Sequence, residues 1–435
     1  MIITTKGIVF NMIDKKIEEA FIAALEEELV PAMGCTEPIA LAYAAAKARR
    51  VLGKEPLEIV AYCSGNIIKN VRCVQIPHSH GLRGIEAAVA LGAIGGDPDK
   101  DMEVLESVTK EEASAAAVFA REHCSVVYLD SEIPLHFIIE MTSDERVLVE
   151  VRHDHTNISR IVKNGSVIYE NLEAPAEAEN TAEETYTVEN IKDFADSIEL
   201  SRVERLIERQ IAYNMAIADE GMSGRYGIGI GKAILEACED TVTSRMKAYA
   251  AAASEARMDG CDMPVVINSG SGNQGIASSV PIIVYAKEKG YGKEELYRAL
   301  VFSALLTIYQ KTFIGKLSAF CGAVSAACAS GAAITYLSGG STTEIKDTIN
   351  NTLADIPGII CDGAKVSCAA KIASSIDAAM MAHYLAKNGK AYAESSGIIK
   401  ETVDRTISCV GHIGRFGMKE TDKDIILGML RDDGK

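Results

Sequence analysis

Apolar residues recur at helical spacing near the start of the chain and predict a first amphipathic helix over 13–30, ended by Pro31. The apolar stripe of this helix consists of Ile13, Ile17, Phe21, Ala24, Leu25 and Leu29. An Ala-rich run follows up to Leu52, with Pro38 in its first turn and Gly53 just after its end, and it predicts a second helix. Cys35, in the short loop between the two runs, is therefore expected at a helix N-terminus.

The hydrophobic period then changes from helical spacing to alternation. Residues 57–62 predict a short buried strand, and 84–92 predict a helix that ends at a Gly-Gly-Asp-Pro turn. Alternating segments within 125–170 predict an antiparallel meander, and Asn164-Gly165 predicts a type I′ hairpin turn inside it. Residues 171–187 are rich in Ala and Glu without apolar periodicity, which predicts a linker.

The rest of the chain is predicted to be mostly helical, with one strong strand signal at 263–268. The predicted helices span 190–218, 231–257, 275–289, 293–309, 317–337, 343–354, 368–388, 397–410 and 421–431. We therefore expect an α+β fold in two domains. Residues 1–187 form an N-terminal α+β domain with a small antiparallel sheet and the Cys35 loop, and residues 188–435 form a mainly helical domain.

The composition favours a small-molecule substrate. Among 435 residues, 44 Lys and Arg stand against 61 Asp and Glu, which leaves a formal charge of −17. A surface that follows phosphates needs clustered basic residues, so this balance argues against nucleic acids and anionic membranes as partners, while a homo-oligomer stays compatible with it. The uncharged stretch 317–343 is long enough to cross a bilayer, but its Ala, Gly, Ser and Cys content predicts a buried, closely packed helix instead.

The cysteine usage points to a reducing compartment. The eleven cysteines are an odd number spread over a long chain, unlike the dense framework of a small secreted domain. Residues 1–30 show no secretory signal pattern. We therefore expect a cytoplasmic protein whose cysteines are reduced thiols, available in part as metal ligands.

A Gly-rich segment is the first candidate binding site. Gly270, Gly272 and Gly275 match the spacing G-x-G-x-x-G between a predicted strand and a predicted helix. A dinucleotide site also needs a following strand that ends in an acidic residue, whereas here the helical pattern continues to Tyr297. We reject the nucleotide but retain an anion at a helix N-terminus, such as a substrate carboxylate, with a Gly-rich turn without ligand as the alternative. The candidate binding residues are Ser269, Gly270, Ser271, Gly272, Asn273 and Gln274.

Two further motifs are predicted to be structural. Residues 227–232 resemble a phosphate loop only superficially, since Tyr226 stands where the first glycine is needed and Ala233 replaces the Mg-binding hydroxyl residue. This segment is predicted to be a Gly-rich helix entry. Histidine pairs occur at 78–80 and 153–155, but without a companion such as an HExxH motif they are predicted to be hydrogen-bonded loop residues rather than metal ligands.

The cysteines of the second half indicate a metal centre. Cys321 and Cys328 share one predicted helix but lie about 10.5 Å apart along it, too far to bind one small centre together. Cys361 and Cys368 flank Asp362-Gly363 after a Pro-Gly pair, which predicts a loop that folds both thiolates inward. Three thiolates can thus converge, and zinc or an iron–sulfur cluster are the ordinary occupants. The cysteines predicted to be small buried hydrophobes are Cys63, Cys73, Cys124, Cys238 and Cys409.

Taken in order, five motifs resemble the L-cysteine desulfidase family, which is related to the α chain of iron–sulfur L-serine dehydratases. These motifs are Pro31–Pro38, Ser64–Asn70, Ile76-Pro77 followed by Gly81–Gly84, Ser269–Gly275 and Cys361–Cys368. The resemblance covers nearly the whole chain. The spacing of Cys321, Cys361 and Cys368 looks like the cluster-ligand set of the family.

The resemblance implies a [4Fe-4S] cluster held by these three cysteines and an iron–sulfur-dependent lyase. Its reaction would be β-elimination of L-cysteine to sulfide, pyruvate and ammonia. Cys35 matches the proposed catalytic base of the family, and a thiol beside helix N-terminal N–H groups is also expected to have a lowered pKa. A role as a fourth cluster ligand is the alternative for Cys35.

Two other functions stay open on the sequence. The chain lacks a visible second module of the kind that a serine dehydratase β domain would add, which favours cysteine as the substrate, but an L-serine dehydratase of the same type is the alternative. A non-enzymatic thiolate site, holding structural zinc or sensing redox state, is the rival from another class. The strands of 125–170 have no assigned role in either function.

Overall fold

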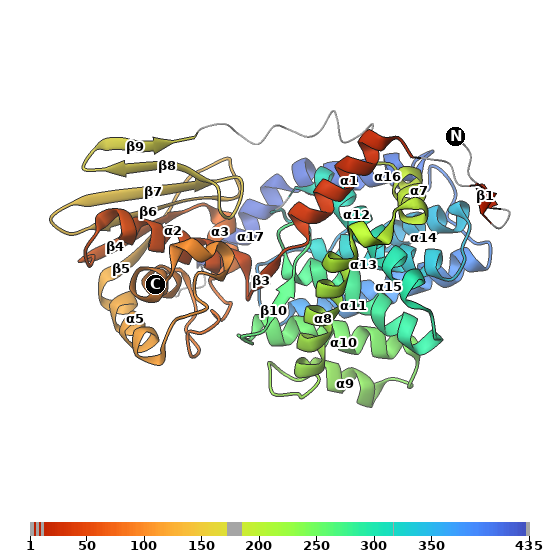
Figure 1. Ribbon diagram of the computed structural model, residues 1–435, viewed down its shortest axis with the longest axis horizontal. Helices are drawn as coiled ribbons and strands as arrows, with labels where there is room; N and C mark the ends of the chain where they lie inside the picture. Colours follow the sequence, from red (N-terminus) through yellow and green to blue (C-terminus); the bar gives the residue numbers. More distant parts are fainter. Residues whose placement is uncertain (1–3, 6–7, 10–12, 172–184, 316, 432–435) are drawn as a thin grey trace.

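The computed structural model describes residues 4–5, 8–9, 13–171, 185–315 and 317–431. Figure 1 shows a part with a β-sheet and flanking helices beside a part that consists almost entirely of helices. The predicted α+β fold with a mainly helical C-terminal region is confirmed. The linker predicted over 171–187 falls mostly on residues outside the described ranges.

A six-stranded mixed sheet forms the centre of the first part, in the order β5-β4-β6-β7-β8-β9. The antiparallel meander is confirmed for β6 to β9, but β5 runs parallel to β4 at one edge, because helices connect the two strands. The φ angles of Asn164 and Gly165, 52° and 81°, are those of the predicted type I′ turn. The strands are β4 (Glu58–Cys63), β5 (Cys124–Tyr128), β6 (His136–Thr142), β7 (Arg146–Arg152), β8 (Ile158–Lys163) and β9 (Ser166–Glu170).

One face of this sheet is covered by helices. Alternate residues of the central strands, such as Ile59, Phe137 and Val149, are fully buried, as the period of two requires. They belong to one core with α2 (Thr36–Leu52) and α4 (Ile85–Gly95). The remaining elements of this part are α3 (Gly65–Val71), the 3₁₀ segment η1 (Pro98–Glu103) and α5 (Lys110–His123).

The second part is a helical assembly with its own large core. Its helix α13 is buried along nearly all of its length, and a Cβ on Gly331 would lie 2.8 Å from Ala379 of α15. The predicted closely packed helix is therefore confirmed from Gly322 onward. The helices are α7 (Val188–Ser197), α8 (Glu204–Gly221), α9 (Ile230–Ala237), α10 (Val242–Met258), α11 (Gly272–Lys289), α12 (Lys293–Ile314), α13 (Gly322–Leu337), α14 (Thr342–Asp355), α15 (Cys368–Lys387) and α16 (Val403–His412).

Three elements connect the two parts, and they can be followed in Figure 1. Helix α1 (Lys15–Glu28) packs its apolar stripe into the helical core although it precedes the sheet in sequence. Strand β3 (Pro31–Met33) pairs antiparallel with β10 (Pro264–Val266) of the helical part. Helix α17 (Lys419–Arg431) ends the described chain against α3. A separate two-stranded ribbon pairs β1 (Thr4–Thr5) with β2 (Ile8–Val9).

Several predicted boundaries were wrong. The helices expected at 190–218 and 231–257 are each two helices, separated by the 3₁₀ turn η2 (Leu200–Arg202) and by the N-cap Thr241, whose side chain accepts a hydrogen bond from the backbone of Ser244. The segment 31–33, expected as a loop, is a strand because its partner lies far away in sequence. Residues 317–321 and 398–402 are not helical, and a π-helical turn η3 (Ile413–Gly417) follows α16.

Two of the cysteines predicted to be buried are exposed. Cys73 lies in the turn after α3 and Cys238 at the end of α9, where neither side chain faces a core. Apolar composition alone did not indicate this, because both positions depend on where the helix ends. Among the described residues, no helix combines the length and the apolar content needed to cross a membrane.

Candidate functional site

The candidate residues from distant parts of the sequence line one cavity between the two parts. It is lined by Cys35, by the three predicted ligands Cys321, Cys361 and Cys368, and by Ser269, Gly270, Ser271, Asn273 and Gln274. Gly272 is the one candidate that does not line it. The cavity volume of about 90 Å³ is well below the roughly 300 to 1,000 Å³ of sites for drug-sized ligands and restricts the occupant to a small group.

Four helices begin at this cavity. Cys35 is the N-cap of α2, Ser271 that of α11 and Cys321 that of α13, while α15 begins at Cys368. The first N–H groups of a helix have no partner within the helix, and this end carries a partial positive charge. The four N-termini together therefore favour anionic groups in the cavity, such as thiolates and a carboxylate.

A short backbone pairing brings Cys321 and Cys361 together. The Cys321 N–H donates to the Ile359 carbonyl oxygen at 2.8 Å, and the Cys361 N–H donates to the Ala319 carbonyl oxygen at 2.7 Å. The segments before the two cysteines thus run antiparallel, with Phe320 opposite Ile360. As a result the two thiol groups hydrogen-bond to each other.

The cysteine loop (Cys361–Cys368) is held against the sheet part. A Cβ on Gly363, whose φ is +94°, would lie 2.0 Å from the Lys69 carbonyl oxygen, so only glycine permits this contact. Lys371 donates to the Ile360 carbonyl oxygen at 2.7 Å and to the Asp362 carboxylate at 2.5 Å, which ties the loop to α15. The predicted folding of this loop toward the cavity is thereby explained.

Ammonium groups surround the buried thiols. The hydrogen bond from Cys321, together with Lys69 and Lys371, lowers the pKa of Cys361 despite its burial. The same hydrogen bond and burial raise the pKa of Cys321 well above its usual value. Burial lowers the pKa of Lys311 to about 8, an effect opposed by Cys321 and Cys361. Of these thiols, Cys361 is therefore the one whose thiolate form the surrounding positive groups favour, since burial raises the pKa of Cys321 and Cys368.

The donor set fits an iron–sulfur cluster. Among the described residues, no three His, Cys, Asp or Glu side chains are grouped as ligands of a single ion. Soft thiolates that line one cavity, with ammonium groups nearby, are the donors that such clusters use.

Cys35 lies in this cavity, but its thiol is not activated in the predicted way. Burial, followed by the charge of Glu37, raises the pKa of Cys35 well above its usual value, while Arg257 opposes this shift. The expectation of a lowered pKa was wrong, because a helix N-terminus contributes about 1 kcal/mol whereas full burial shifts a pKa by up to several units. The Cys35 thiol instead donates a hydrogen bond to Glu37 Oε2 at 3.0 Å.

The Glu37 carboxylate is held by two further donors. Asn70 Nδ2 donates to Glu37 Oε1 at 3.1 Å, and the Thr36 hydroxyl group lies 3.1 Å from Glu37 Oε2. Thr36 Oγ1 also lies 3.0 Å from the Gly270 carbonyl oxygen and so connects α2 to the Gly-rich loop (Ser269–Gln274). Because Glu37 and Asn70 are buried and both line the cavity, Cys35 has a fixed proton acceptor beside it.

The Gly-rich loop makes a tight turn into α11, as the sequence predicted. Ser269 and Gly270 have φ angles of +49° and +75°, and the backbones of Asn268 and Ser271 exchange hydrogen bonds across them. A Cβ on Gly275 would lie 2.0 Å from the Val266 carbonyl oxygen, so the start of α11 is pressed against β10. The amide oxygen of Gln274 is buried without a hydrogen-bond partner among the described residues, so the loop offers an acceptor as well as donors.

Comparison with known proteins identifies the family. Residues 99–427 match the serine dehydratase alpha chain family. The chain belongs to this family. It is 47% identical over 408 residues to a UPF0597 protein of Lachnoclostridium phytofermentans, covering 93% of this chain and 98% of the relative. It is also 45% identical over 431 residues to a UPF0597 protein of Treponema denticola, covering 97% of this chain and 100% of that relative.

The serine dehydratase alpha chain match includes the Gly-rich loop and the three cysteines, whereas Cys35 and Glu37 precede it. The predicted relationship to this family is confirmed, and the family suggests a lyase that acts on amino acids. The L-cysteine specificity stays a prediction.

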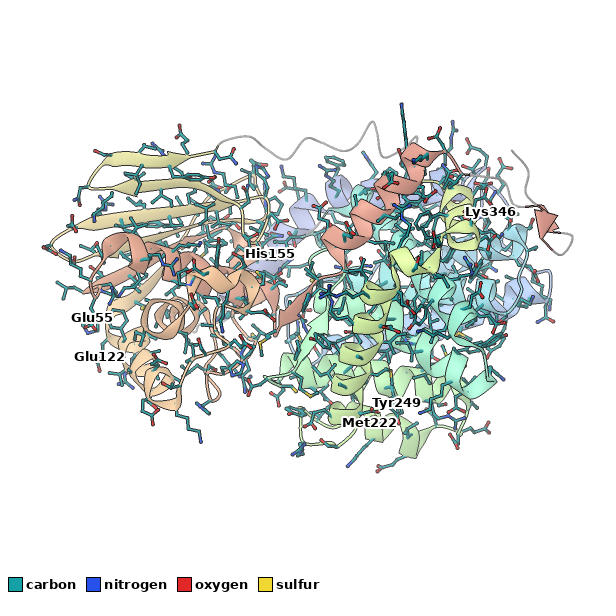
Figure 2. The ribbon with its side chains drawn as sticks, viewed as in Figure 1. Glu55, Glu122, His155, Met222, Tyr249 and Lys346 are labelled. Carbon is teal, nitrogen blue, oxygen red and sulfur yellow. The ribbon has the colours of Figure 1, made fainter. Side chains whose placement is uncertain are left out.

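Among the residues that line the cavity, Glu37, Asn70, His155 and Arg257 were not assigned to the site by the sequence reasoning. Glu37 and Asn70 stand inside motifs that carried the family resemblance, and Arg257 is a lone basic residue at the end of an Ala-rich helix. These features of the sequence could have pointed to Glu37, Asn70 and Arg257 as site residues. His155 comes from the loop between β7 and β8, and Figure 2 shows it at the junction of the two parts. The meander of 125–170 thus contributes one buried side chain to the site.

The structure places the histidine pair at 153–155 and the segment 227–232, two of the motifs predicted to be structural. His153 lines a separate cavity of about 570 Å³, so the pair at 153–155 is divided between two cavities. The segment 227–232 enters α9, and its backbone N–H groups at Ile228 and Ile230 donate to the buried Glu255 carboxylate at 2.9 and 2.8 Å. This loop therefore binds an anion of the protein itself.

Proposed function

We propose that this chain is an iron–sulfur-dependent lyase of the cytoplasm that eliminates the β-substituent of L-cysteine to give sulfide, pyruvate and ammonia. The observation that carries the proposal is one small cavity lined by three thiols, the Cys35–Glu37 pair and the N-terminus of α11. Cys321, Cys361 and Cys368 would hold the cluster. A bound [4Fe-4S] cluster with three cysteine ligands supplies Lewis acidity toward the leaving group at its remaining iron.

Proton removal is assigned to Cys35. Its thiol proton passes to Glu37 Oε2, the atom to which it is already hydrogen-bonded, and the thiolate then takes the proton from Cα of the substrate. Asn70 and Thr36 keep the Glu37 carboxylate in place during this transfer. Loss of the β-sulfur as sulfide leaves aminoacrylate, which takes up one water and yields pyruvate and ammonia.

The Gly-rich loop would bind the rest of the substrate. The N–H groups at the start of α11 suit an α-carboxylate, and the buried amide oxygen of Gln274 suits an α-ammonium group.

L-serine is the second candidate substrate, favoured by the name of the matched family. The same residues would act in the same order, and water would leave in place of sulfide. The two reactions share the carboxylate, the ammonium and the Cα proton, so these contacts support both equally.

Anaerobic purification and a side-by-side assay test the proposal. We expect a brown protein that contains iron and sulfide, and pyruvate formed from L-cysteine faster than from L-serine. Faster turnover of L-serine would assign the dehydratase reaction instead. A colourless anaerobic preparation with stoichiometric zinc, or an iron-loaded protein that forms no pyruvate from either amino acid, would contradict the proposal and favour a structural or redox-sensing thiolate site.

Cysteine variants test the ligand assignment. Replacing Cys321, Cys361 or Cys368 by Ser is expected to abolish iron retention in each case, because each of the three thiolates would hold one iron of the cluster. Cys328→Ser is the matched control, since Cys328 is a buried thiol in the interior of α13, away from the cavity. Full iron content in any of the three ligand variants would exclude that residue as a ligand.

A further inference from the structure

Arg257 is a buried guanidinium without a carboxylate partner in the described part of the chain. It lies in the last turn of α10, is 2% exposed, and is among the largest fully buried side chains. The carboxylate two residues earlier, Glu255, is engaged by the backbone of 228–230 instead. A guanidinium keeps its charge in proteins, and burying an unpaired charge is costly. Its position therefore needs a compensating anion.

The contacts of Arg257 leave it partly unsatisfied. Its Nη1 donates to Asn273 Oδ1 at 3.2 Å, and its Nε is buried without a hydrogen-bond partner among the described residues. Ser254 Oγ donates to the same Asn273 oxygen at 3.1 Å. With its oxygen occupied twice, Asn273 is left with its amide N–H groups as donors at the cavity.

Gly272 gives the guanidinium access to the start of α11. A Cβ at this position would lie 2.3 Å from Arg257 Nε, so any other residue would displace the side chain. This explains why Gly272 does not line the cavity itself: it makes room for a side chain that does. Arg257 thus stands beside the positive end of α11, where like charge is unfavourable unless an anion lies between them.

We propose that Arg257 binds the α-carboxylate of the substrate, together with the Asn273 amide and the first N–H groups of α11. This rests on the proposed function, which supplies a small amino acid as the ligand. Arg257 and Cys35 line the same cavity, and the charge of Arg257 lowers the pKa of Cys35 against the effect of burial. The carboxylate and the Cα proton of the substrate would therefore lie at neighbouring points of this cavity. A neutral amide oxygen alone offsets a buried guanidinium poorly, whereas a carboxylate matches its fork geometry.

Calorimetry with two inert ligands tests this. L-alanine has the carboxylate and ammonium of the substrate but no leaving group, and L-alaninamide lacks the carboxylate. We expect anaerobically purified wild-type protein to bind L-alanine at least about 30-fold more tightly than L-alaninamide. Arg257→Gln is expected to lose about 30-fold or more in affinity for L-alanine with little change for L-alaninamide, and Arg257→Lys to lose less.

Arg245→Gln is the matched control. Arg245 lies on the same helix, where it pairs with Asp240 and Glu288 away from the cavity, and its loss should leave both affinities unchanged. Equal binding of the two ligands by the wild type would overturn the proposal, and this comparison does not depend on the folding of any variant. Full L-alanine affinity in Arg257→Gln would also overturn it. Pyruvate formation is measured separately, so failure of the lyase reaction and failure of the Arg257 assignment are distinguishable.

Discussion

At the scale of single residues, the proposed proton transfer rests on the hydrogen bond between Cys35 and Glu37. A thiol whose pKa is raised by burial is a poor base alone, but here its proton is already directed at a carboxylate oxygen 3.0 Å away. The proton can therefore leave without entering water. The pair resembles other activated nucleophiles, in which an adjacent base rather than a low intrinsic pKa supplies the thiolate.

Removing either member of the pair is expected to stop turnover without loss of iron. Cys35→Ala and Glu37→Gln should each lower kcat by roughly 10² to 10⁴-fold, the usual effect of losing a general base. Iron content, measured on the same preparations, should stay at the wild-type level. Glu26→Gln, a charge loss at an exposed position on α1, is the control.

Three results would revise this assignment. Loss of iron in Cys35→Ala would make Cys35 a cluster ligand. Normal turnover in Cys35→Ala would leave it as an ordinary buried thiol. Normal turnover in Glu37→Gln would show that the proton of Cys35 has another acceptor.

At the scale of elements, the geometry of the thiols depends on one loop and one backbone pairing. The cysteine loop is fixed by hydrogen bonds between 319–321 and 359–361 and by the contact of Gly363 with the Lys69 carbonyl oxygen. Neither constraint lies within a helix or a strand. Periodicity therefore carried no signal for them.

Gly363→Ala is expected to weaken iron binding and to destabilise the fold. The added Cβ would meet the Lys69 carbonyl oxygen at 2.0 Å and must displace the loop that carries Cys361. Gly389→Ala is the matched control, since Gly389 also has a positive φ, +65°, but nothing within 4 Å of its Cβ position.

Both variants should lose about 1 kcal/mol through backbone strain. Only Gly363→Ala should also lose iron, as measured by iron content per chain after purification. Equal iron content in the two variants would show that the loop adapts without disturbing the thiols.

At the scale of the whole molecule, the site lies where the two cores meet, and the end of the chain helps to hold them together. Lys69 of α3, with its side chain 1% exposed, pairs with Asp422 of α17 at 2.5 Å and also reaches the Ser318 carbonyl oxygen at 3.4 Å. Asn66 donates to the same carboxylate at 2.9 Å. Since Lys69 also acts on Cys361, α17 is linked to the thiols through one buried ammonium.

Asp422→Asn is expected to destabilise the protein by about 3 kcal/mol, because it leaves the buried Lys69 ammonium without its counter-charge. Chemical denaturation measures this free energy of unfolding. Asp424→Asn, an exposed carboxylate on the same helix, should change it by less than about 0.5 kcal/mol. An equal effect of the two substitutions would show that the α17 contact contributes little to stability.

The sequence by itself determined the helices and strands whose pattern is set by near neighbours. The stripe of α1 from Ile17 onward, the caps of α2 and the Asn164-Gly165 turn all follow from spacing within a few residues, and each is present, although α1 begins at Lys15, after the predicted Ile13. The candidate site residues could also be found from local sequence, because they stand in short motifs. The division of the chain near residue 187 stays a prediction.

Only the tertiary structure decided what depends on residues far apart in the chain. The pairing of β3 with β10, the parallel edge strand β5 and the convergence of four helix N-termini need partners more than 40 residues away. The pKa of Cys35 and the unpaired charge of Arg257 likewise follow from burial, which a local pattern does not fix. Spacing determines which side chains share a face, whereas desolvation and charge pairing depend on everything packed around them.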